Sequence, residues 1–277
     1  MIPAQLPAMI VAEVRKIWTG VSAPLAVLLS VLVGAFVAWG VSRIANKEPG
    51  SVQLQSGAGP SQSLSDLIQT DVVVVAGWAL RFRSAYLLPP LLAFIAASSV
   101  AGELSDRTLR ELLVRPVPRW SVLLAKYVAL SSVVVATLVG TALPAFGLGQ
   151  LMVGPALVSS ELQNCLIAYV ASGVCDLAVL SIVVLASLLL RSVGGVVVVL
   201  VLLFGFDLGV RGVLLLLSQL GVEWAGPASS WTLGNALLAW ETWVGGQWDP
   251  ARFVALAVVW GITSAASAMY FSKMDVG

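Results

Sequence analysis

The segment AGELSDRTLRELLVRPVPRW, residues 101–120, concentrates charge between two long apolar runs. Within it, Asp106 lies four residues before Arg110. Arg107 likewise lies four residues before Glu111, and this spacing allows ion pairs along one face of a helix. Charges of both signs on a short helix favour docking to another protein.

The same segment carries signals for both ends of that helix. Ser105 can cap the N-terminus, where the helix dipole also favours Asp106. Pro116 then disfavours continuation. We therefore predict a short amphipathic helix on the inner membrane face; the alternative is a solvated loop that only satisfies the bias for positive charge on that side. The polar residues that would meet the partner are Glu103, Ser105, Asp106, Arg107, Arg110, Glu111 and Arg115.

A second set of charges lies inside apolar runs, at Asp176, Asp207 and Arg211. Charged groups in a membrane span usually face the bundle interior or a water-filled cavity. Helical rise places both aspartates about 22 Å from the inner boundary, so we predict one polar cluster between the fourth and fifth spans. The alternative is a structural ion pair of Asp207 with Arg211, with Asp176 hydrogen-bonded to neighbours such as Ser172.

The amino-acid composition is that of a membrane protein. Apolar residues make up 59% of the 277 residues and charged residues 10%, whereas about 25% is usual in soluble domains. The net charge of +1 gives no sign of nucleic-acid binding. The chain has no His and two Cys, so we expect no metal site.

Runs of about 20 apolar residues predict spans. We predict an all-α membrane protein, one transmembrane domain over residues 1–277, with membrane lipid as its solvent. Residues 72–80 are too short to cross and are assigned to the outer surface, and a loop is predicted through Gly147, Gly149 and Pro155. The six predicted spans are 21–42, 84–102, 121–145, 162–190, 192–217 and 253–272.

Lysine and arginine set the expected orientation. Nine of them fall on the inner side and six on the outer side if both termini are cytoplasmic, and the inner loops are the shorter ones. Ile10, Val14, Ile17 and Val21 lie on one helical face, which predicts an amphipathic helix on the inner surface before the first span. The alternative is that this helix simply continues into the span.

Five of the ten tryptophans lie between residues 224 and 248. Tryptophan favours the membrane–water interface. We predict an outer interfacial helix from Ser229 or Ser230 to about residue 244, either straight or as a re-entrant hairpin, before the sixth span. Its residues Trp231, Trp240 and Trp243 would form an exit gate, contact an outer partner, or simply anchor the protein.

The charged segment and the span after it resemble type-2 ABC exporter permeases, in the branch that includes copper-enzyme-maturation and gliding-motility permeases. Arg107 stands where that family often has Gly. The six-span layout extends the resemblance less specifically over the whole chain. The matching positions are Glu103, Thr108, Leu109, Leu112, Leu113, Arg115, Pro116, Val117, Arg119 and Lys126.

The resemblance implies a permease subunit in the inner membrane that is not itself an enzyme. Residues 103–115 would bind a separate nucleotide-binding ATPase subunit, and ATP and Mg²⁺ would be held there. The sequence contains no G-x-x-x-x-G-K-[ST] motif for ATP binding. Six spans are half of the set that such a transporter usually has, so we expect two copies of the chain to form a homodimer.

Three functions remain open at this stage. The first is export of a hydrophobic or amphipathic substrate. The second is a membrane scaffold that transmits ATPase work to an outer-face accessory protein without cargo. The third is an ion-coupled carrier that uses Asp176 and Asp207, which would be expected to show inverted repeats.

Overall fold

The computed structural model describes residues 6–45, 71–105, 118–155, 159–244 and 250–273. Over these ranges every regular element is helical. The helices are α1 Leu6–Thr19, α2 Ser22–Ala45, α4 Val72–Phe82, η1 Arg83–Leu87, α5 Leu88–Ala97, η2 Ser98–Gly102, α6 Glu103–Ser105, α8 Arg119–Met152, α9 Ser159–Leu190, α10 Val193–Gln219, α11 Ala225–Ser230, α12 Leu233–Leu237, α13 Glu241–Val244 and α14 Pro250–Lys273.

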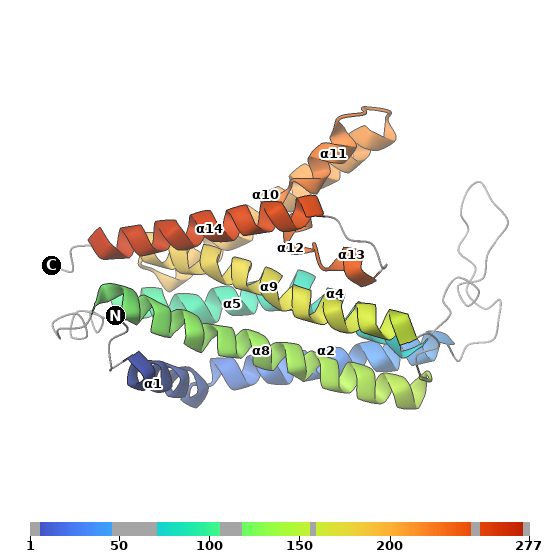
Figure 1. Cartoon of the computed structure of the whole chain (residues 1–277), viewed down its shortest axis with the longest axis horizontal. Coiled ribbons are helices and arrows are strands. Elements are labelled where there is room, and N and C mark those ends of the chain that lie inside the picture. Colours follow the sequence, from blue (N-terminus) through green and yellow to red (C-terminus); the bar gives the residue numbers. More distant parts are fainter. Residues whose placement is uncertain (1–5, 46–70, 106–117, 156–158, 245–249, 274–277) are drawn as a thin grey trace.

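Six helical stretches in the described part of the chain are long and apolar enough to cross a membrane. They run side by side along the long axis of the molecule (Figure 1). The start of α8 and the end of α14 lie at the same end of this bundle as α1, and we call it the α1 end. The prediction of an all-α membrane protein with six spans is confirmed.

The second span is longer than predicted, because it begins at Val72 and continues to Gly102. Asp71 caps its first turn by accepting hydrogen bonds from Val73 N at 2.9 Å and Val74 N at 3.1 Å. The assignment of residues 72–80 to a separate surface segment is wrong. The wide π-turn η1 precedes Pro89 and Pro90, and such a turn accommodates residues that lack an N–H donor.

The third span also extends beyond its predicted end. α8 continues through Pro144 to Met152, across most of the region where we predicted a loop. Gly149 explains part of this extension, because a Cβ there would lie 3.2 Å from side-chain atoms of Val72 and Val75. The last turns of α8 are thus held against α4.

The first two helices are separate, so the alternative of one continuous helix is not observed. α1 ends at Thr19 and α2 begins at Ser22. Trp18 Nε1 donates to Ser132 Oγ of α8 at 3.0 Å. This contact fixes the end of α1 against the third span.

The segment before the last span is not the single helix that we predicted. Residues 225–244 form the three short helices α11, α12 and α13. Leu237 and Trp240 are buried in the same core as residues of α4, α8 and α9. The later part of the segment therefore folds into the bundle, whereas α11 lies beside the end of α10, away from the other helices (Figure 1).

The contact between α2 and α8 gives a first testable prediction. A Cβ on Gly34 would lie 2.5 Å from Thr141 O and 2.7 Å from Pro144 Cγ, whereas Gly40 on the same helix has nothing within 4 Å. We expect Gly34→Ala to destabilise the protein by about 1–3 kcal/mol, since overpacking displaces backbone.

The measurement is the thermal midpoint of the detergent-solubilised chain, followed by size-exclusion chromatography after heating. Gly40→Ala is the matched control and should melt close to the wild type. Equal midpoints for the two variants would contradict the close approach of α2 and α8.

Candidate functional site

The predicted coupling segment is described only at its two ends. Asp106, Arg107, Arg110, Glu111 and Arg115 lie outside the described residues. Glu103 and Ser105 bound the short helix α6, which follows directly on the second span. The partner-binding role of the segment therefore stays a prediction.

Glu103 lies in a charged network at the α1 end. Its carboxylate contacts Lys16 Nζ at 2.6 Å and Lys126 Nζ at 2.7 Å. Lys126 also contacts Glu13 Oε2 at 3.3 Å and donates to Ser99 O at 3.1 Å. These contacts join α1, the end of the second span and α8, and we call the four charged side chains Glu13, Lys16, Glu103 and Lys126 the α1 network.

Two of these side chains are withdrawn from solvent, with exposed fractions of 2% for Lys126 and 7% for Glu103. Burial alone would lower the pKa of Lys16, but the hydrogen bond and charge of Glu103 outweigh burial and raise it above its ordinary value. Lys16 therefore stays charged at physiological pH. The motif had indicated Glu103 and Lys126, and the structure adds that they contact each other.

The far end of the charged segment is also attached to the bundle. Arg119 begins α8, and its Nη1 donates to Ser272 O near the end of α14 at 3.2 Å. A displacement of the segment would therefore act on α1 and α8 through Glu103 and on α14 through Arg119.

A second buried ion pair lies in the middle of the bundle. Arg83 Nη1 contacts Asp176 Oδ2 at 2.8 Å. Arg83 Nη2 donates to Val134 O and to Thr137 Oγ1, both at 3.2 Å. The arginine side chain is completely buried, so these bonds tie together the second, third and fourth spans.

The predicted cluster of Asp176 with Asp207 and Arg211 is wrong. Asp176 pairs with Arg83, while Asp207 Oδ2 accepts from Gly234 N at 2.8 Å and so connects α10 to α12. A Cβ on Gly234 would lie 3.4 Å from Arg211 Nη1. The alternative partner Ser172 donates instead to Tyr169 O at 2.9 Å.

Sequence reasoning missed Arg83 because residues 72–80 were assigned to the outer surface and the second span was started at residue 84. One signal was available: Arg81 and Arg83 are cations beside an apolar run, and Asp176 is a lone anion inside another. A buried charge needs an opposite charge.

The three predicted interface tryptophans differ in environment. Trp231 is 62% exposed, Trp240 is 1% exposed, and Trp243 is partly buried against the core. The prediction that Trp240 lies at the outer interface is therefore wrong. It fills the core where α13 approaches α4 and α9.

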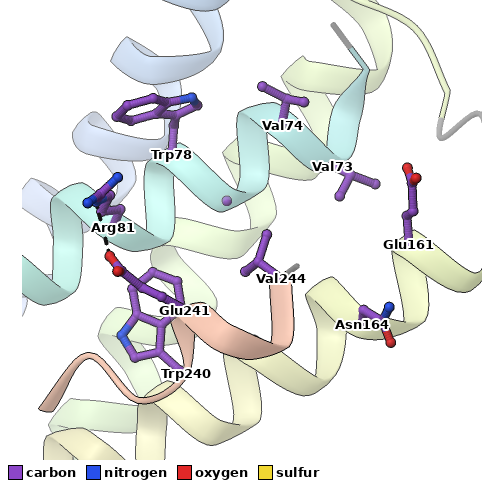
Figure 2. A pocket seen from close by; sticks show the side chains of 10 residues that line it. Val73, Val74, Trp78, Arg81, Glu161, Asn164, Trp240, Glu241 and Val244 are labelled. Carbon is purple, nitrogen blue, oxygen red and sulfur yellow. Dashed lines mark ion pairs between the residues drawn. The ribbon is translucent and has the colours of Figure 1, made fainter. Parts of the chain in front are cut away.

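This approach forms a pocket of about 720 Å³ at the end of the bundle opposite to α1. Arg81 contributes from α4 and Glu241 from α13, and they form an ion pair of 3.0 Å between Nε and Oε1 (Figure 2). Glu161 and Asn164 lie on the α9 side. The pocket is lined by Val73, Val74, Gly77, Trp78, Arg81, Glu161, Asn164, Trp240, Glu241 and Val244.

Comparison with known proteins places this architecture in a family. No curated protein matches the chain with significance. The family model described as ABC-2 family transporter protein matches residues 9–206, more than half of the chain. Those residues include the whole α1 network, Arg83, Asp176 and the charged segment. Members of this family are transmembrane subunits that work with a nucleotide-binding partner. The chain is thus a multi-pass membrane protein and belongs to the ABC-2 transporter family.

Proposed function

We propose that the chain is the permease subunit of an ATP-driven exporter in the inner membrane. A separate nucleotide-binding subunit would bind the charged segment 103–115 on the cytoplasmic side and hold ATP and Mg²⁺. Its closure would move the spans and carry a hydrophobic or amphipathic substrate across or out of the membrane.

The α1 network is the observation that supports this proposal most directly. A partner can do work on spans only through side chains that connect its docking segment to them. Glu103 begins that segment and contacts Lys126 of the third span at 2.7 Å. Because Lys126 is almost fully buried, a shift of Glu103 would be passed to α8 rather than absorbed by solvent.

The pocket favours export over the alternative of a scaffold without cargo. A volume of about 720 Å³ lies in the range of small-molecule sites. The ion-coupled carrier is less favoured, since Asp176 is held by Arg83 in a fully buried pair.

A second copy of the chain is part of the proposal. Both α10 and α14 are apolar, but only 11% of the residues in an apolar window of each are buried within the single chain. A homodimer would cover part of these faces and complete a twelve-span path between the copies. An outer-face accessory protein would then contact the end of the bundle opposite to α1.

The test is co-purification. We expect an ATPase subunit to accompany the tagged wild-type chain solubilised from its native cells in mild detergent, and to be lost from Arg110→Glu/Glu111→Arg. This variant reverses two charges of the predicted docking segment without changing its net charge.

The matched control is Arg81→Glu/Glu241→Arg, which reverses an ion pair at the opposite end of the bundle. It should retain the ATPase. If no ATPase accompanies the wild type, or if both variants keep it equally, the docking role of residues 103–115 is wrong.

A further inference from the structure

The pocket between α4, α9 and α13 carries an excess of negative charge. Its lining holds one cation, Arg81, and two anions, Glu161 and Glu241. Arg81 and Glu241 pair at 3.0 Å. Among the charged residues that line the pocket, Glu161 is left without an opposite charge, and it is exposed at the start of α9.

The remaining lining is apolar and aromatic. Val73 and Val74 face the pocket from α4, Val244 from α13, and Trp78 and Trp240 border it from the two sides. Gly77 brings α4 close to Val244, whose Cγ1 lies 3.6 Å from the position that a Cβ on Gly77 would take. The pocket therefore offers an apolar body to a ligand and acidic groups to its polar end.

The contacts of Arg81 show that this part of the pocket attracts a positive charge. Its guanidinium carbon lies 5.7 Å from the centre of the Trp78 ring while its Nε contacts Glu241. An aromatic face beside a carboxylate is a favourable place for a cation. Arg81 occupies that place, so Glu161 is the carboxylate of the lining that is left for a ligand cation.

One buried polar group belongs to a residue of the lining and lacks a hydrogen-bond partner. Trp240 is 1% exposed, and its Nε1 has no hydrogen-bond partner among the described residues. A buried donor is almost always satisfied by protein, water or a ligand. This donor is open to a water molecule, and it carries no information on the charge of a ligand.

We propose that this pocket binds amphipathic cations, with the positive group at Glu161 and the apolar body between the valines and tryptophans. The binding itself depends only on the pocket. That such a cation is the transported cargo rests on the proposed function as an exporter.

The experiment uses tritiated tetraphenylphosphonium, a lipophilic cation, and the full chain in phosphatidylcholine nanodiscs, with empty nanodiscs subtracted. We expect saturable binding to the wild type. Glu161→Gln should weaken it about fivefold, because a charge pair in a partly exposed site contributes about 1 kcal/mol. Tetraphenylborate, which has the same shape and the opposite charge, should not compete.

Glu223→Gln is the matched control, since Glu223 is an exposed glutamate outside the pocket lining. It should bind like the wild type, and all variants should elute and melt as the wild type does. The proposal is overturned if the folded wild type shows no saturable binding, if Glu161→Gln binds as tightly as the wild type, or if tetraphenylborate competes equally.

The ATPase subunit is absent from this experiment, so its result is independent of the docking test. If the chain binds the cation saturably but recruits no ATPase, the cation pocket is supported and the exporter proposal is overturned. If the chain recruits an ATPase but binds no cation, the exporter proposal stands and the proposed cation pocket is overturned.

Discussion

Asp176→Asn is expected to cost about 3–5 kcal/mol of folding free energy, because it leaves a buried arginine without its opposite charge. Arg83 has no exposed surface, and Asp176 Oδ2 lies 2.8 Å from its Nη1. The surrounding spans supply only neutral partners, Val134 O and Thr137 Oγ1. The measurement is the fraction of tagged chain that elutes as one symmetric size-exclusion peak in mild detergent.

The double variant Arg83→Met/Asp176→Leu should recover most of that loss. Buried ion pairs can often be replaced by apolar residues of similar volume without destabilisation. Removing Arg83 leaves no orphaned group behind, because Thr137 Oγ1 already donates to Val134 O at 2.9 Å. Arg81→Met is the matched control, since Arg81 is two residues away and 53% exposed.

These variants also separate structure from transport. If the double variant is stable and active, the Arg83–Asp176 pair serves only to hold three spans together. A double variant that is stable but inactive would give the charges a part in the transport cycle. Asp176→Asn with the yield of the wild type would contradict the importance of the pair altogether.

The number and approximate positions of the spans were predictable, because they follow from the lengths of the apolar runs. Five of the six spans appear near their predicted positions within the described residues. The second span was cut short because Arg81 and Arg83 count as charges that end a hydrophobic run. Hydropathy along the chain contains no information on Asp176, which lies 93 residues further on and neutralises Arg83.

The site was predictable only where a local motif existed. Glu103 and Lys126 belong to a recognisable pattern of about 25 residues, but their contacts with α1 bring together residues 87 and 113 positions apart. The pocket combines three segments from different parts of the chain. Trp240 shows the same difficulty, since an interface and a core are equally acceptable to an indole ring in a membrane protein.

Lys126→Met is expected to have the second large effect, a loss of about 3 kcal/mol in folding free energy. The side chain is 2% exposed and contacts Glu103 at 2.7 Å and Glu13 at 3.3 Å. Without it, Glu13 and Glu103 each lose a positive partner, although Glu103 keeps its contact with Lys16. The cost should stay below that of Asp176→Asn, because Lys16 still neutralises part of the network.

Lys16→Met is the matched control, because Lys16 contacts the same carboxylate of Glu103 at 2.6 Å but is 59% exposed. Exposed ion pairs contribute about 0–1 kcal/mol, so the thermal midpoint should fall much less than with Lys126→Met. Lys126→Arg, which keeps the charge, should lie between the two. If Lys126→Met and Lys16→Met melt alike, Lys126 is solvated in the native protein. Glu103 would then move without moving α8, and the proposed path from the docking segment to the spans would have to run through Arg119 and α14 instead.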